Sequence, residues 1–262
     1  MASPQKKSAF TLIELLTVIA LIGILAALLL AAVAEAKARA MRIQCANNVR
    51  QLGIGLQAFL TDNSCYPLFI DPGHGGWMAL LQHAELSLPG NPTNHIPFSR
   101  WSGQGVWKCP SANRPKDWPE HLGYLSYGYN TYGMSAQTDT NSLGLGGHFV
   151  WDYPKNTRWT APSVRESEVV APSEMMAIAD GLIGNNGVVQ DGTYVLWRRY
   201  GVTNYLDSTA RAFERHQGRA NVVFCDGHVE SPTLQFLFAD TSDAALVRWN
   251  RDHLPHREEL SP

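Results

Sequence analysis

The chain opens with a strongly apolar segment and then changes to a mixed polar and aromatic sequence. From Leu15 to Ala34 there are twenty residues without a single charge. About 20 helical residues cover the ~30 Å hydrocarbon core of a bilayer, so this run is long enough for a membrane helix. Lys6 and Lys7 precede the run, and Glu14 stands at its front edge. The pattern predicts an N-terminal hydrophobic helix followed by a separately folded head.

Helical periodicity continues after the apolar run. Apolar residues recur there at spacings of three and four, the stripe of an amphipathic helix: Ala38, Met41, Cys45, Val49, Leu52, Leu56 and Phe59. No proline interrupts the chain between Phe10 and Tyr66. Gly53 and Gly55 lower helix propensity and would suit a break. We nevertheless expect one helix over about residues 10–60, with its striped face packed on the head.

The rest of the chain, from about residue 61, contains many Gly and Pro residues and short apolar runs. We predict short helices over 77–83 and 241–250, and strands over 105–108, 125–129, 175–179, 187–198, 219–225 and 228–231. Asp226-Gly227 between the last two strands is typical of a two-residue hairpin turn. A long helix followed by antiparallel strands, without βαβ alternation, indicates an α+β fold.

Three classes of protein have an N-terminus of this kind. A secretory signal peptide has a basic start, an apolar run and small residues for cleavage, such as Ala32 and Ala34. A plain membrane anchor needs only the apolar run. In both classes Glu14 is a cost, because an unpaired carboxylate is unfavourable in lipid. In a filament, the terminal amine of a neighbouring subunit can neutralise that carboxylate and fix the register. We therefore favour a filament subunit over a secreted or simply anchored protein.

Residues 9–14 (AFTLIE) resemble the cleavage and methylation motif of type IV pilins and type II secretion pseudopilins. The resemblance implies that a prepilin peptidase cuts after Ala9, where the family usually has Gly, and that Phe10 becomes the methylated N-terminus. Glu14 would then be the fifth mature residue, which serves subunit register. The resemblance also implies a single-pass protein of the bacterial inner membrane with an extracytoplasmic head. Inner-membrane assembly machinery would then place it in a periplasmic or extracellular filament of identical or related subunits.

A second resemblance lies in the head. His216 stands nine residues before Asp226-Gly227, which matches the H-x9-DG signature of a pilin-like group abundant in planctomycete- and verrucomicrobia-type bacteria. Other segments similar to this group are 45–48 (CANN), 107–110 (WKCP), 126–130 (SYGYN) and 173–176 (SEMM). The group is named by its motif, and no biochemical role comes with that name. The fold implied is pilin-like: a long N-terminal helix packed on an antiparallel-sheet head.

Composition narrows the range of partners. Aromatic residues make up 10% of the 262 residues, which suits a folded head. The formal charge of −2 gives no indication of a basic surface for nucleic acid, so we do not expect such a partner.

The four cysteines (Cys45, Cys65, Cys109 and Cys225) show no CxxC spacing. Their even number permits two disulfides with three connectivities; we expect one at most, and its pairing stays open.

Asp180, His216 and Asp226 are the candidate metal ligands of the head. Calcium is the cation to consider, because some secretion pseudopilins bind it, but calcium takes six to eight oxygen ligands and this set has only two carboxylates. Asp226 and Gly227 also suit a tight turn, which is their more ordinary role. We therefore expect no cofactor.

The sequence has no G-x-S-x-G, H-E-x-x-H or phosphate-loop motif, so we do not expect this chain to be an enzyme.

These patterns divide the chain into a leader (1–9), a transmembrane and assembly helix (10–34), its amphipathic continuation (35–60) and a globular head (61–262). The function expected is that of a structural subunit of a type II secretion or type IV pilus-like filament. The alternative within this class is a minor pilin at the filament tip, whose aromatic head surface recognises a partner.

Overall fold

The computed structural model describes residues 11–68, 70–71, 75–84, 105–111, 126–134, 142–147, 149–152, 157–160, 163–180, 215–238 and 240–259. The expected leader, with Ala9 and Phe10, lies outside these residues, as does the expected strand 187–198. The chain forms two compact units, Met1–Ala40 and Met41–Pro262.

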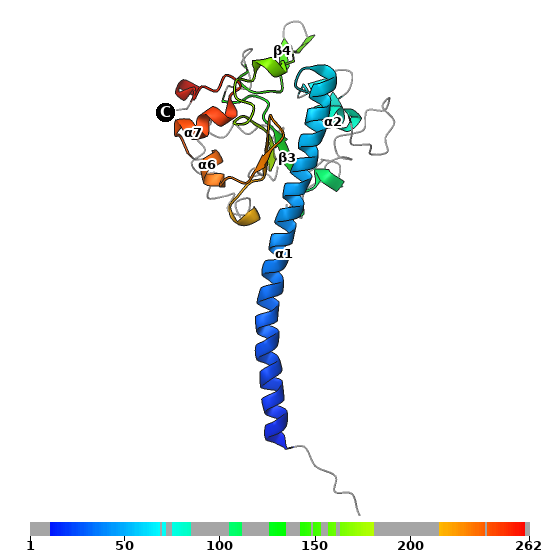
Figure 1. The fold of residues 1–262 in the computed structure, drawn as a ribbon, viewed down its shortest axis with the longest axis vertical. Coiled ribbons are helices and arrows are strands. Elements are labelled where there is room, and N and C mark those ends of the chain that lie inside the picture. Colours follow the sequence, from blue (N-terminus) through cyan, green and yellow to red (C-terminus); the bar gives the residue numbers. More distant parts are fainter. Residues whose placement is uncertain are drawn as a thin grey trace, which may run out of the picture. The chain divides into compact units, whose positions relative to one another are not determined.

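The described segments contain α-helices, short 3₁₀ turns and strands (Figure 1). The α-helices are α1 (Leu12–Asn63), α2 (Trp77–Ala84), α6 (Leu234–Phe238) and α7 (Asp243–Leu246). The 3₁₀ turns are η2 (Gly105–Trp107), η3 (Glu166–Glu168), η4 (Arg215–Gln217), η5 (Val247–Trp249) and η6 (Arg257–Glu259). The strands are β1 (Ile70–Asp71), β2 (Gly75–Gly76), β3 (Tyr127–Tyr129), β4 (Phe149–Asp152), β5 (Thr157–Thr160), β6 (Met176–Asp180), β7 (Val222–Phe224) and β8 (Val229–Glu230).

The first unit contains the apolar start of α1. Its large hydrophobic side chains are exposed, from Leu12, at 82%, through Val33, at 54%. The helix is long and apolar enough to cross a membrane, and its most apolar stretch is not buried against any described residue. The N-terminal apolar helix expected from the sequence is therefore present.

The second unit contains the amphipathic continuation of α1. The buried stripe begins at Cys45 and continues through Val49, Leu52 and Leu56, as the spacing predicts. Other predicted members of the stripe are not fully buried, since Ala38 is exposed and Met41 and Phe59 are half-buried. The helix does not break at the glycines. A Cβ atom on Gly53 would lie 2.5 Å from Cγ2 of Val223 on β7, so this glycine allows α1 to approach the sheet closely.

The main sheet has four antiparallel strands in the order β3-β6-β7-β8. Two further antiparallel pairs are β1-β2 and β4-β5. With the long N-terminal apolar helix, this sheet gives the pilin-like α+β fold that the sequence predicts.

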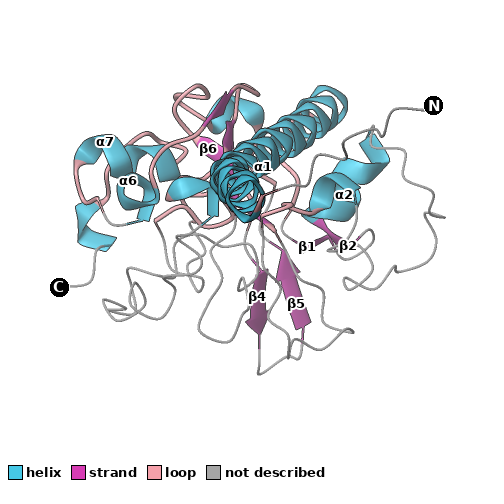
Figure 2. Ribbon diagram, turned by 90° about the horizontal axis from the view of Figure 1, so that it is seen from below, coloured by secondary structure: helices cyan, strands magenta, loops and turns pink. Residues whose placement is uncertain are grey.

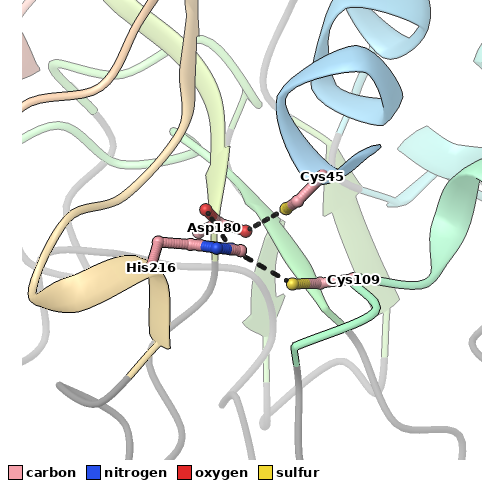
Figure 3. A group of neighbouring side chains, drawn as sticks. All are labelled: Cys45, Cys109, Asp180 and His216. Atoms are coloured by element: carbon pink, nitrogen blue, oxygen red, sulfur yellow. Dashed lines mark hydrogen bonds and ion pairs between the residues drawn. The ribbon is translucent and has the colours of Figure 1, made fainter. Parts of the chain in front are cut away.

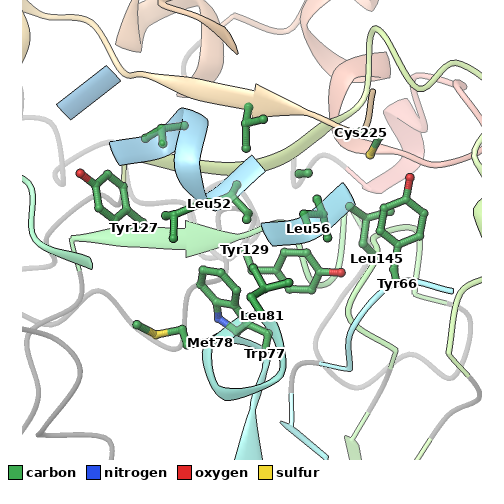
Figure 4. Close-up of a cluster of buried hydrophobic side chains, with 14 of the residues drawn as sticks. Leu52, Leu56, Tyr66, Trp77, Met78, Leu81, Tyr127, Tyr129, Leu145 and Cys225 are labelled. Carbon is green, nitrogen blue, oxygen red and sulfur yellow. The ribbon is translucent and has the colours of Figure 1, made fainter. Parts of the chain in front are cut away.

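One face of the sheet packs against α1 and α2. Leu52 and Leu56 of α1 meet Tyr127 and Tyr129 of β3 (Figure 4). Trp77 of α2 stacks on Tyr129 with ring centroids 5.3 Å apart. This aromatic and aliphatic core holds the second half of α1 in the head, because large apolar surfaces are removed from water together.

The opposite face carries a second core, covered by α6 and α7. These helices lie on one side of β6 and α2 lies on the other (Figure 2). On β7, Val222 and Phe224 point to this second core and Val223 to the first, as strand alternation requires. The head is thus layered, with a sheet between two groups of helices.

The segment 105–108 differs from its prediction. It forms the 3₁₀ turn η2 instead of a strand. Gly105 has φ +57°, outside the extended region, and the backbone N–H of Lys108 donates to the carbonyl of Gly105. A short apolar run flanked by glycine does not specify a strand, because local periodicity is too brief to separate it from a turn.

The β7-β8 hairpin is present, but its connection is longer than the predicted two residues. Val223 pairs with Val229, and the backbone N–H of Phe224 donates to the carbonyl of His228 at 3.0 Å. Three residues, Cys225 to Gly227, therefore form the connection, with φ +90° at Gly227. The backbone N–H groups of Cys225 and Asp226 donate to the loop before β6, which explains why the ladder ends one residue earlier.

Candidate functional sites at the N-terminus and in the head

The first described turn of α1 forms a reciprocal cap between Thr11 and Glu14. The backbone N–H and the hydroxyl of Thr11 donate to the Glu14 carboxylate at 2.8 and 2.7 Å. The backbone N–H of Glu14 donates in turn to the Thr11 hydroxyl at 3.3 Å. This is a capping box, which satisfies donors at a helix start that have no partner within the helix. Glu14 is exposed, so its carboxylate remains accessible to a neighbouring molecule.

The head contains a buried group of four polar side chains, Cys45, Cys109, Asp180 and His216 (Figure 3). Each comes from a different element: α1, the segment after η2, the end of β6, and η4. Their potential ligand atoms all lie within 4.8 Å of one another. The fold thus brings together donors from four distant parts of the sequence.

The contacts within this cluster converge on a small volume. The Cys45 thiol lies 3.0 Å from Oδ1 of Asp180. Nε2 of His216 lies 3.3 Å from Oδ2 of Asp180 and 3.3 Å from Sγ of Cys109. Nδ1 of His216 is buried and has no hydrogen-bond partner among the described residues. The polar contacts of this ring are therefore made by Nε2, which faces the cluster.

Further side chains hold the cluster from outside. The backbone N–H and the side-chain amide of Asn221 donate to Oδ2 of Asp180 at 2.7 and 3.0 Å. The amide of Asn48 donates to the hydroxyl of Tyr127 at 3.3 Å, and that hydroxyl lies 3.3 Å from Sγ of Cys45. The carboxylate and one thiol are thus oriented by fixed neighbours.

Burial and mutual contacts shift the protonation of this cluster. A hydrogen bond to Cys109, burial and the Asp180 charge raise the pKa of the Cys45 thiol. Burial lowers the pKa of His216, but hydrogen bonds to Asp180 and Cys109 outweigh it and raise the pKa to about 9. Burial, followed by the neighbouring Cys45 and Asp180, raises the pKa of Tyr127, so its hydroxyl stays a donor.

The backbone at η4 supports the position of the imidazole. His216 has φ 50° and ψ 31°, the left-handed region that few non-glycine residues occupy. Such a conformation costs about 1–3 kcal/mol and persists only where the surroundings hold it. The contacts of the ring with Asp180 and Cys109 contribute to holding it.

The arrangement differs from a Cys-His-Asp catalytic triad. In a triad, the nucleophile and the carboxylate bond to different nitrogens of the histidine. In this head both Cys109 and Asp180 approach the same nitrogen, Nε2. Potential ligand atoms that face one small volume, as these four do, are typical of a cation site.

The structure separates the sequence-predicted candidates. Asp180 and His216 lie together in the cluster, whereas Asp226 lies in the hairpin connection. There Oδ1 of Asp226 accepts the backbone N–H of His228 at 3.1 Å and lies 2.6 Å from Nδ1 of that ring. Asp226 and Gly227 therefore occupy the turn, and Asp226 is no neighbour of the four clustered side chains.

Cys45 and Cys109 are the members of the cluster that sequence reasoning did not single out as ligands. All four cysteines of the described chain are free thiols. The available signal was that both lie in segments similar to the H-x9-DG group, 45–48 and 107–110. Spacing alone did not connect them, because they come from separate elements.

A scan against protein families finds the prokaryotic N-terminal methylation motif over residues 4–30. No characterised protein and no solved structure is significantly similar to the chain. The matched segment contains residues 9–14 and most of the apolar run. The match supports a type IV pilin-like or pseudopilin-like precursor that is membrane-anchored, processed by a prepilin peptidase and assembled with pilin-like subunits.

Proposed function

We propose that this chain is a structural subunit of a type II secretion or type IV pilus-like filament. A prepilin peptidase cuts it after Ala9, methylates Phe10 and releases a mature chain that assembles through α1. Inner-membrane assembly machinery then moves the subunit into a periplasmic or extracellular filament. His216 and Asp226-Gly227 suggest that the head belongs to the H-x9-DG group of such proteins.

The observation that carries this proposal is the methylation motif at the start of an uncovered apolar helix. The motif match covers residues 4–30. From Leu12 to Val33 the large apolar side chains of α1 are exposed, with exposed fractions of 46–82%. An apolar surface of this extent requires lipid or neighbouring helices. A subunit that passes from the membrane into a helical bundle is surrounded first by lipid and then by neighbouring helices.

Glu14 fits the second of these environments. Its carboxylate is exposed at the start of α1 and is bonded within the chain by Thr11. In a bundle of such helices, the amine of a mature Phe10 on a neighbouring subunit would offer the opposite charge. Pairing of this kind in a low-dielectric bundle favours one register over others.

The test is the mass of the N-terminal peptide of protein purified from bacterial membranes that contain a prepilin peptidase. We expect a peptide that begins at methylated Phe10. A start after Ala34 or Ala36 would show ordinary secretion and overturn the filament proposal. An intact N-terminus would show a permanently anchored protein and would also overturn it. In the same preparation, a sheared filament fraction should contain the chain.

A further inference from the structure

We propose that Cys45, Cys109, Asp180 and His216 form a tetrahedral zinc site that fastens α1 to the rest of the head. The inference is independent of filament assembly, because it concerns side chains that are all buried in the second unit. It also assigns a role to two cysteines that were not among the candidate metal ligands of the sequence.

The separations of the donor atoms suit this ion. Zinc bonds of about 2.3 Å to sulfur and about 2.0 Å to nitrogen or oxygen, at tetrahedral angles, place ligand atoms roughly 3.3–3.8 Å apart. The contacts of Nε2 of His216 with Sγ of Cys109 and Oδ2 of Asp180 are both 3.3 Å. Sγ of Cys45 lies 3.0 Å from Oδ1 of Asp180. The donor atoms as a whole lie within 4.8 Å of one another, so adjustments of up to about 1 Å would bring all four to zinc-binding distance.

The donor types select the metal. Two thiolates and an imidazole are soft or borderline ligands, which bind zinc well. Calcium prefers six to eight oxygens, and this cluster offers the oxygens of only one carboxylate. Binding would release the thiol protons of Cys45 and Cys109, and the bound ion would balance the charge of the two thiolates and the carboxylate in the buried site.

Neighbouring side chains orient two of the four proposed ligands, Asp180 and Cys45. Ligands are usually held by hydrogen bonds from a surrounding shell. Asn221 donates twice to Oδ2 of Asp180, which leaves Oδ1 turned toward Cys45. Asn48 donates to Tyr127, whose hydroxyl is free to donate to Sγ of Cys45. Both ligands are thereby preoriented.

The site has the character of a structural zinc centre. All four ligands come from the protein and all are buried, whereas catalytic zinc keeps a position open to water or substrate. Cys45 is also the first buried residue along α1. A metal bound here would join the beginning of the buried part of α1 to β6, η4 and the segment after η2.

Two other states of the cluster compete with this proposal. The first is a disulfide between Cys45 and Cys109, which an oxidising compartment would favour. The second is a hydrogen-bonded network in which the imidazolium of His216 pairs with the carboxylate of Asp180. Each state excludes the proposed site, so both can be distinguished from it by experiment.

The test uses the full chain purified in detergent after growth with zinc, with metal content measured by mass spectrometry. We expect about one zinc per chain in the parent protein and in Cys65→Ser. Cys45→Ser and Cys109→Ser should contain almost none. Cys65 is a matched control, because it is a partly buried thiol outside the cluster.

A second measurement does not depend on the folding of variants. Cobalt replacing zinc in the parent chain should give the intense visible bands of tetrahedral coordination and a near-ultraviolet thiolate charge-transfer band. Absence of stoichiometric zinc, or equal zinc in Cys45→Ser, would overturn the proposal. A disulfide between Cys45 and Cys109, found by peptide mapping without reduction, would overturn it as well.

Discussion

Gly53 is the residue at which α1 comes close to β7. An added Cβ would lie 2.5 Å from Cγ2 of Val223, so Gly53→Ala must shift the buried Val223 side chain, the helix or the strand. Overpacking of this kind costs about 1–3 kcal/mol, and the better helix propensity of alanine returns up to ~1 kcal/mol. We expect a lower melting temperature for the head, measured by near-ultraviolet circular dichroism of the full chain.

Gly23→Ala is the matched control for that substitution. Nothing lies within 4 Å of a Cβ at Gly23, so alanine there changes helix propensity without overpacking. The double variant Gly53→Ala/Val223→Ala should lose less stability than the sum of the losses of the two single variants, because Val223→Ala removes the crowded methyl groups. A Gly53→Ala head as stable as the parent would show that the close approach does not restrict this position.

Asn221 is the residue that sets the orientation of Asp180. Asn221→Ala removes the amide bond to Oδ2 at 3.0 Å but leaves the backbone N–H bond at 2.7 Å. Loss of a partner in the surrounding shell typically weakens metal affinity by about 10–100-fold. We expect zinc affinity to fall within this range in competition with a chromophoric chelator. Asn63→Ala, on the exposed end of α1, should leave the affinity unchanged.

At the scale of elements, the β7-β8 hairpin depends on the side chain of Asp226. Its carboxylate accepts the backbone N–H of His228 at 3.1 Å and contacts the ring of that residue. Asp226→Ala loses these bonds and should destabilise the head by about 0.5–1.5 kcal/mol. Asp226→Asn keeps an acceptor at the same place and should lose less. Chemical denaturation of the full chain in detergent measures both, and equal stability of all three chains would contradict a turn role.

The elements that the sequence predicts well are those specified by their own residues. The stripe at Cys45, Val49, Leu52 and Leu56 predicts the buried face of α1, because helical spacing alone decides which side chains align. The hairpin is also local. Its connection is one residue longer than predicted because Cys225 bonds to Met175, which is distant in sequence. Turn chemistry alone contains no information about that partner.

The cluster in the head could be predicted only in part, for the same physical reason. Cys45 and Asp180 are 135 residues apart, and Cys109 and His216 are 107 residues apart. Their proximity depends on sheet order and on the docking of α1, neither of which residue spacing specifies. Residue type was enough to identify Asp180 and His216 as candidate ligands. Cys45 and Cys109 become candidates only in the folded chain, where they lie beside these two side chains.

At the scale of the whole molecule, the two units depend on different surroundings. The head has its own cores on both faces of the main sheet. The unit Met1–Ala40 instead exposes the apolar length of α1. Its stability must therefore come from lipid or from other subunits. A substitution in this unit should affect location and assembly, while a substitution in the head should affect folding.

Glu14 provides the sharpest test of that division. Its side chain bonds within the described chain to Thr11 at the exposed start of α1, so Glu14→Ala should leave head stability unchanged. Processing after Ala9 should also continue, because the cleavage point is retained. Assembly should fail, since a terminal amine buried without its partner costs about 3–5 kcal/mol, a loss of roughly 100-fold or more in association. Processing is measured by N-terminal mass and assembly by recovery in sheared filaments.

Glu35→Ala is the matched control, because Glu35 is a second exposed carboxylate on α1 and pairs with Arg39 at 2.5 Å within the same helix. Exposed pairs of this kind contribute at most about 1 kcal/mol, so this variant should be processed and assembled like the parent. Filaments of normal yield from Glu14→Ala would refute the register role. Loss of assembly in both variants would attribute the defect to the overall charge of α1. Only failure of Glu14→Ala alone connects assembly to the carboxylate at the start of the apolar helix.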